Sequence, residues 1–115
     1  IMNSIDLNPE IISQSDNFIA WKVDEPDGET TYHLDINNLT VHFFVEEWEQ
    51  FIEFKNLFIN TEKDKTGELA QTEDYYLSCE KTENGDLVYS MEIIGATLYF
   101  FEDDWTEFKE LVRNL

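Results

Sequence analysis

Apolar and polar residues alternate over two neighbouring stretches of the chain, residues 30–36 and residues 39–45. A period of two with one apolar side is typical of a half-buried β-strand. Asn37 and Asn38 separate the stretches, and Asn tolerates the left-handed conformation that a tight turn requires. The pattern therefore predicts an antiparallel hairpin.

A further strand is expected at residues 17–23, where large apolar residues are frequent. The Asp-Gly pair at residues 27–28 joins it to the next strand as a hairpin turn. After residue 45 the apolar period changes from two to about 3.6, which indicates a helix with one apolar stripe. This stripe consists of Trp48, Phe51, Phe54 and Phe58.

The same order of patterns recurs 57 residues further along the chain. Residues 16–58 align with residues 73–115 without a gap, and nine of these 43 positions are identical. The identical pairs are Gly28/Gly85, Tyr32/Tyr89, Ile36/Ile93, Thr40/Thr97, Phe43/Phe100, Phe44/Phe101, Trp48/Trp105, Phe51/Phe108 and Glu53/Glu110. A fixed internal period indicates a duplication.

We therefore predict an α+β fold made by tandem duplication of a strand–strand–strand–helix unit, with antiparallel meander sheets and pseudo-two-fold symmetry. One helix packs on the sheet of each unit, so that Trp48 and Trp105 are core residues. The 115 residues form one domain with repeats at 16–58 and 73–115. Residues 1–15 form an N-terminal segment, either a helical turn or a short edge strand, and residues 59–72 connect the repeats with a turn at Gly67. The pattern leaves open whether the repeats share one sheet or form two.

The formal net charge of -19 changes the choice of partners. Such a charge repels phosphate backbones and anionic membranes, so we expect no direct binding of nucleic acid and no membrane contact. It favours association with a basic protein. The alternative is that the acids only keep the protein soluble.

Cys79 is the single cysteine, so an internal disulfide and a cysteine zinc site are excluded, and we expect its side chain to be buried. No apolar run is long enough to span a bilayer, and no secretory leader pattern opens the sequence. We therefore expect a cytoplasmic protein. No phosphate-binding glycine loop or catalytic constellation is recognisable, so we expect a protein that is not an enzyme and needs no cofactor.

The outward face of the predicted sheets carries the candidate interface. Large aromatic residues on that face indicate a surface that is covered by something. The cover is a partner, a second copy of the chain, or the packing of the two sheets on one another. The interface candidates are Phe44, Tyr99, Phe101, His33, His42, Asp35 and Glu92.

His33 and His42 share the outward face of adjacent predicted strands, with Asp35 nearby, which raises the question of a metal site. Their counterparts in the second repeat are Ser90 and Tyr99, and no third residue lies at a sequence spacing typical of metal ligands. We therefore predict no metal site.

The tandem unit, with its hairpin from Thr30 to Val45 and the following sequence Glu47-Trp48-Glu49-Gln50-Phe51, resembles the repeats of the PUR and Whirly single-strand-binding families. The resemblance lies in the order of the elements and covers most of the chain. It implies curved sheets with helices behind them. Those families bind nucleic acid through basic and aromatic sheet faces, whereas the matching face here carries Asp35 and Glu92 and almost no basic residue. The resemblance therefore implies an architecture without that function.

These observations favour a non-enzymatic protein-interaction module. One specific hypothesis is an immunity-like or antitoxin-like inhibitor, which offers carboxylates where a basic nuclease or nucleic-acid-binding protein expects phosphates. Two alternatives stay open from the sequence. They are a homo-oligomeric module that buries its aromatic sheet face, and a module that binds a small ligand between the repeats.

Overall fold

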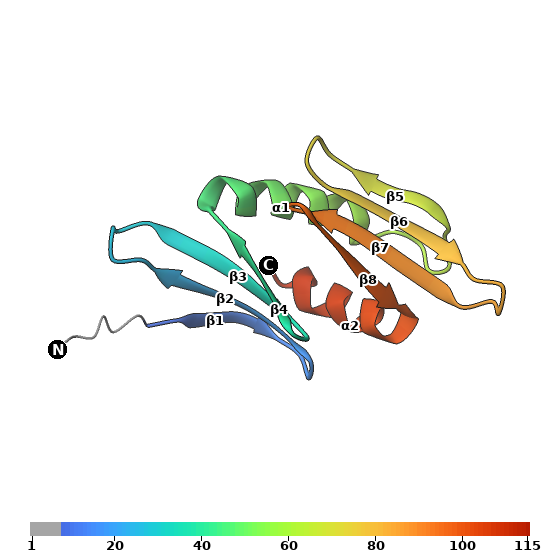
Figure 1. The fold of residues 1–115 in the computed structure, drawn as a ribbon, viewed down its shortest axis with the longest axis horizontal. Helices are drawn as coiled ribbons and strands as arrows, with labels where there is room; N and C mark the ends of the chain where they lie inside the picture. The colour runs from blue at the N-terminus through green and yellow to red at the C-terminus, as the bar shows by residue number, and fades with distance from the viewer. Residues whose placement is uncertain (1–7) are drawn as a thin grey trace.

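The computed structural model describes residues 8–115 and shows an α+β protein built of two sheet-and-helix units (Figure 1). The first unit comprises β1 (Glu10–Gln14), β2 (Phe18–Asp24), β3 (Thr30–Ile36), β4 (Leu39–Phe43) and α1 (Val45–Phe58). The second unit comprises β5 (Gly67–Gln71), β6 (Tyr76–Lys81), β7 (Leu87–Ile93), β8 (Ala96–Phe101) and α2 (Glu102–Arg113). Each unit forms its own four-stranded antiparallel sheet with the strands in chain order. The predicted fold class is confirmed, and the repeats form two sheets.

Each sheet has a fourth strand, which was predicted for the first sheet only as an alternative to a helical turn and was not predicted for the second. β1 lies in the N-terminal segment, of which residues 1–7 are outside the described chain, and β5 lies in the predicted connection. β1 and β5 are 57 residues apart, so they obey the same repeat. Both contain an irregularity in pairing, between Ile11 and Ser13 and between Glu68 and Ala70. Such a bulge interrupts the alternation of side chains, which is why the period of two was not visible there.

The hairpin turns follow the predicted positions. Asn37 has a φ of 55°, and the equivalent turn in the second unit places Ile94 at 45° and Gly95 at 74°. The positive φ at both central residues of the second turn is the type I′ arrangement that suits the twist of the flanking strands, whereas in the first turn only Asn37 has a positive φ. Ile94 is a poor choice for it, because a β-branched side chain is strained in the left-handed region.

The inner face of each sheet packs against the helix of the same unit, as predicted. Trp48 of α1 stacks on Tyr32 with 4.8 Å between ring centroids, and Trp105 of α2 stacks on Tyr89 at 4.7 Å. Both tryptophans are buried, and Cys79 is buried too. The two equivalent stacks show that the repeat is one of packing as well as of sequence.

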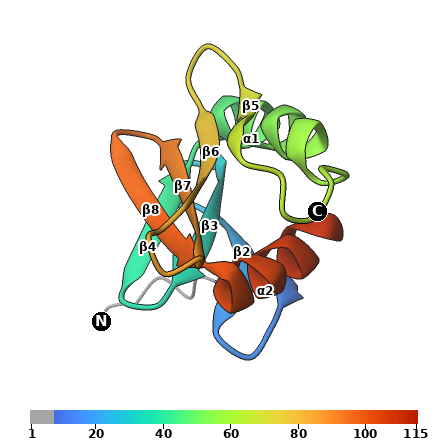
Figure 2. The same cartoon turned by 90° about the vertical axis from the view of Figure 1, so that its right-hand side faces the viewer.

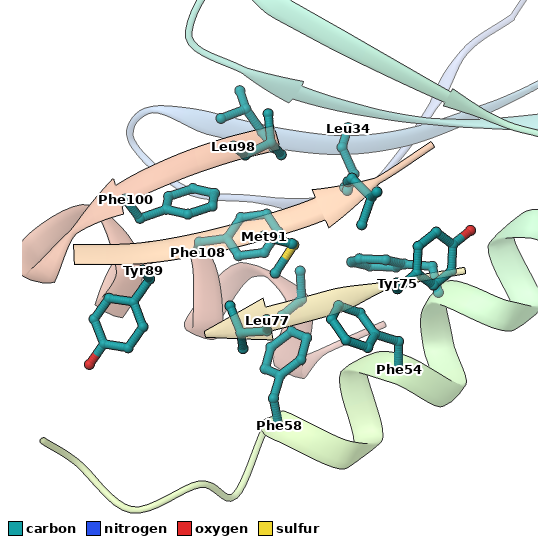
Figure 3. Close-up of a cluster of buried hydrophobic side chains, with 14 of the residues drawn as sticks. Leu34, Phe54, Phe58, Tyr75, Leu77, Tyr89, Met91, Leu98, Phe100 and Phe108 are labelled. Carbon is teal, nitrogen blue, oxygen red and sulfur yellow. The ribbon is translucent and has the colours of Figure 1, made fainter. Parts of the chain in front are cut away.

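Each helix also packs against the sheet of the other unit, which the sequence did not reveal (Figure 2). Phe108 of α2 meets Phe18 of the first unit edge-on, with ring centroids 6.1 Å apart. Phe51 of α1 meets Tyr75 of the second unit in the same way at 6.3 Å. Figure 3 shows this shared core, with Phe54 of α1 reaching across to the second unit. The two units therefore enclose one common hydrophobic core.

Polar contacts tie the units together at the rim of this core. Glu107 of α2 accepts hydrogen bonds from the Ser15 hydroxyl and from the backbone N–H and side-chain amide of Asn17, at 2.5, 2.7 and 2.8 Å. Desolvation opposes ionisation, but these three donors lower the pKa of the Glu107 carboxyl overall. On the opposite side, the Tyr75 hydroxyl donates to the carbonyl of Glu47 at 3.0 Å.

Neither of the two helices within residues 8–115 is long and apolar enough to cross a membrane.

Candidate functional site

The outer face of the first sheet carries a stack of aromatic rings. In the register of β2, β3 and β4, Trp21 lies beside His33, and His33 lies beside His42. The Trp21 and His33 rings are stacked with centroids 3.8 Å apart, and His42 meets His33 edge-on at 4.5 Å. His33 is thereby buried, although it points away from the core. Both histidines were predicted from the sequence to lie on this face, but Trp21 was not, although its outward position follows from the alternation around Ala20.

A hydrogen-bond chain fixes the protonation of His33. Thr31 has one hydroxyl hydrogen, which it donates to the Glu25 carboxylate at 2.7 Å. The hydroxyl oxygen therefore accepts from Nε2–H of His33 at 2.9 Å. Nδ1 of His33 is then an acceptor, and within residues 8–115 it has no hydrogen-bond partner. Burial and the neighbouring His42 lower the pKa of His33, against the opposing effects of Glu25 and Asp35.

The Asp35 carboxylate accepts hydrogen bonds from neighbouring side chains on the same face of the sheet. Its carboxylate accepts from Nε1 of Trp21 at 3.1 Å and from the Thr40 hydroxyl at 2.7 Å. In the described part of the chain, no group of three or more His, Cys, Asp or Glu side chains is placed to hold a metal ion. The outer face of the first sheet is thus an internally bonded network, and its histidines are held by that network.

Among residues 8–115, no such network lies on the outer face of the second sheet. Ser78, Ser90 and Tyr99 stand where the first sheet has Trp21, His33 and His42, and Glu92 is the counterpart of Asp35. The alternative in which the two sheets pack through their outer faces is wrong, because the outward aromatic side chains are free. Phe44, Tyr99 and Phe101 are 64%, 71% and 63% exposed.

Phe44 and Phe101 are the N-cap residues of α1 and α2, and each stands at a shallow hollow. The Phe44 hollow is lined by Glu25, Pro26, Asp27, Thr31, His42 and Phe44. The Phe101 hollow is lined by Asp86, Leu87, Phe101, Glu102, Asp103 and Asp104. Phe44 and Phe101 are the one pair of lining residues at equivalent positions of the repeat, so the two hollows resemble each other in composition and not in the rest of their lining. Each combines an exposed phenyl ring with carboxylates and contains no basic side chain other than a histidine.

The predicted interface residues do not form one patch. α1 begins at the left of Figure 1 and α2 begins at the right, so the Phe44 hollow is separated from the Phe101 hollow. Tyr99 lies on β8 with Phe101, two residues away on the same face. The structure therefore groups Tyr99 with Phe101 and Glu92 on the second sheet. It groups His33, His42, Asp35 and Phe44 on the first.

A further cavity of about 200 Å³ lies against α2. Trp105, Tyr89 and Leu69 contribute to its lining, and residues 61–63 of the connection lie at its edge. Three bases line it, Lys63, Lys109 and Arg113, and three acids, Glu62, Glu102 and Glu110. The charges that line the cavity cancel and so select no ligand by charge. The cavity lies within the second unit and the connection, whereas the alternative expected from the sequence was a pocket between the repeats.

Searches of protein-family models, curated proteins and solved structures found no match for this chain. The candidate site therefore consists of what the chain itself presents, which is two acidic hollows, each with one of the equivalent exposed phenylalanines Phe44 and Phe101.

Proposed function

We propose that this protein is a non-enzymatic interaction module that binds a basic protein partner through its exposed aromatic and acidic surface. The observation that supports this most strongly is the pair of exposed N-cap phenylalanines, Phe44 and Phe101. They are identical in the two repeats although neither is part of the core.

Local stability does not account for phenylalanine at these positions. The N-cap favours Ser, Thr, Asp or Asn, whose side chains accept a backbone N–H, and losing such a cap costs about 1 kcal/mol. Neither Phe44 nor Phe101 makes a side-chain cap hydrogen bond. An exposed ring that stabilises neither helix nor core has its explanation in a contact with something outside the chain.

The surroundings of the two rings indicate the charge of that partner. Glu102, Asp103 and Asp104 follow Phe101 directly, and Glu25 and Asp27 stand beside Phe44. A Lys or Arg side chain is attracted both to the face of an aromatic ring and to nearby carboxylates. The net charge of -19 also accelerates the encounter with a basic protein and opposes the pairing of two copies.

Basic nucleases and nucleic-acid-binding proteins are the partner class that fits this chemistry, because their phosphate sites accept carboxylates. In this proposal the protein acts as an inhibitor in the manner of an immunity protein or antitoxin. The PUR and Whirly families use aromatic residues together with basic ones on their sheets, and the acidic surroundings of the phenylalanines here favour a basic protein over nucleic acid.

The test is a titration of the purified protein against a panel of basic nucleases and DNA-binding proteins at low and high salt. We expect binding that weakens as salt increases, and Phe44→Ser and Phe101→Ser variants that each bind about tenfold more weakly or worse. Serine improves both N-caps, so a loss of binding in these variants is not a loss of folding. Leu57→Ser is the matched control, since Leu57 is an exposed apolar residue of α1 away from both hollows.

If none of the proteins in the panel binds in a salt-sensitive way, the proposal is overturned. A stable dimer by native mass spectrometry, with the phenylalanine rings protected, would favour the homo-oligomeric alternative. A copurified small molecule held in the cavity against α2 would favour the ligand-binding one.

A further inference from the structure

The two sheets have four edge strands, and these edges are not equally protected. β1 and β5 each contain a bulge, and each contacts the helix of the other unit. Bulges and covering helices are the devices by which proteins prevent an edge from pairing with another chain. β4 and β8 have no bulge, and each contacts the helix of its own unit, which packs on the inner face of the sheet.

β8 is the more open of these two strands. It runs from Ala96 to Phe101 with no proline, no glycine, no charged residue and no bulge. β4 is shorter, and at its end the Glu47 side chain accepts the N–H of Phe44 at 2.9 Å. The equivalent N–H of Phe101 has no side-chain acceptor in the part of the chain that the structure describes.

The pairing of β8 with β7 shows which backbone groups are free. The turn at residues 94–95 makes Ile93 and Ala96 a hydrogen-bonded pair, and hydrogen-bonded and non-hydrogen-bonded pairs alternate from there. Thr97 and Tyr99 therefore direct their N–H and C=O groups away from β7. No backbone hydrogen bond within residues 8–115 joins this side of β8 to another segment.

We infer that β8 is a docking edge that takes up an extended basic segment of the partner protein as a fifth strand of the second sheet. This inference rests on the proposed function and adds the site and the mode of binding. Main-chain hydrogen bonds to Thr97 and Tyr99 supply the affinity of such strand addition, and side chains supply the selectivity.

The charges around β8 identify the added strand as basic. Neither β8 nor its neighbour β7 contains a Lys or Arg, whereas Glu92 lies beside Thr97 on the outer face. Beyond the end of β8, the Phe101 hollow adds the carboxylates of Asp86, Glu102, Asp103 and Asp104. A strand that extends along β8 past Tyr99 reaches this hollow, where a Lys or Arg side chain contacts the Phe101 ring and the acids. A second copy of this chain is a poor occupant, since it brings the same negative charge to the edge.

The experiment uses short synthetic peptides in which Lys or Arg alternates with Val or Thr. Each peptide is compared with a version in which alternate backbone amides are N-methylated, which keeps the charge but removes the donors for strand pairing. Binding is measured by calorimetry at low salt to the whole protein. The variants are Thr97→Pro and its equivalent in the first sheet, Thr40→Pro, and neither residue lines the Phe44 or the Phe101 hollow. In both, proline removes an outward N–H of an edge strand, where proline is tolerated.

We expect the unmethylated peptides to bind, and N-methylation and Thr97→Pro each to weaken binding about tenfold or more, while Thr40→Pro leaves it unchanged. The comparison of peptides on the unaltered protein does not depend on how well either proline variant folds. Equal binding of both peptide versions would overturn strand addition while leaving the proposed binding of basic partners intact. Absence of binding by any of the peptides at low salt, together with failure of the nuclease panel, would overturn both.

Discussion

The outer faces of the two sheets differ far more than their inner faces do. On the first sheet, Trp21, His33 and Asp35 form a closed network in which most polar atoms have partners within the chain. On the second sheet, Ser78 and Ser90 leave that space open, and Tyr99 extends into solvent. Two sheets with the same strand order thus present one outer face with an internal hydrogen-bond network and one outer face with exposed side chains.

The inner faces show why the two repeats diverged in this way. Phe43 and Phe100, or Phe51 and Phe108, occupy equivalent buried positions, and a change of volume there is costly in a close-packed core. Outer positions carry no such constraint. Phe44 and Phe101 are the exception, because they are identical and yet exposed, which is the basis of the proposed function.

The largest effect is expected in the shared core. Phe51→Ala and Phe108→Ala should each lower the free energy of unfolding by about 3–5 kcal/mol, since both rings are fully buried and each contacts the other unit. Urea denaturation measures both values. Loss of stability in only one of the two variants would show that the inner faces are not equivalent.

The outer faces should respond unequally to a matched pair of substitutions. Trp21→Ala removes the ring that covers His33 and the hydrogen bond to Asp35, which predicts a loss of about 2 kcal/mol. Ser78→Ala at the equivalent position should change stability by less than about 0.5 kcal/mol. Similar values for the two variants in urea denaturation would contradict the described difference.

The two hairpin turns allow an exchange of residues between the units. Ile94→Asn should raise the free energy of unfolding by about 1 kcal/mol, because Asn tolerates the positive φ that strains a β-branched residue. Asn37→Ile should lower it by a similar amount. Thermal unfolding of the two variants checks the opposite signs, and a gain in both would disprove the strain.

The smallest effect concerns pH. The pKa of His33 in the folded protein lies below its ordinary value of 6.5, so the unfolded chain binds a proton that the folded one resists. Stability that depends on His33 is therefore complete above pH 6.5 and declines as the pH falls from there toward the lowered folded value. Glu25, Asp35 and His42 surround the ring and modulate this decline. His33→Ser should flatten it in pH-dependent melting curves, whereas a decline of unchanged slope would assign it to other groups.

Much of the fold was predictable from local pattern. The alternation in β3 and β4 and the helical spacing after residue 45 each describe one element, and each depends on neighbours close in sequence. Of the bulged strands, β1 was left open as an edge strand or a helical turn and β5 was missed, because their alternation is broken. The reciprocal packing of α1 and α2 was missed because it joins residues such as Phe18 and Phe108, which no local period relates.

The candidate site was predictable only in part. Phe44, Tyr99 and Phe101 were placed on the outward face by the period of two, and all three side chains are exposed in the structure. The burial of His33 was not foreseen, since it depends on a ring that arrives from β2 in the register of three strands. The separation of the Phe44 and Phe101 hollows required the arrangement of the two units in space.

The central claim is that the second sheet presents an open edge while the edges of the first are closed or short. Hydrogen–deuterium exchange at single-residue resolution tests it most directly, with and without the alternating basic peptide. We predict that the amides of Thr97 and Tyr99 exchange quickly in the free protein and become strongly protected when the peptide is added, while those of Thr40 and His42 do not change. The account is contradicted if the peptide protects the amides of Thr40 and His42 as strongly as those of Thr97 and Tyr99. It is also contradicted if the peptide binds and protects none of these four amides.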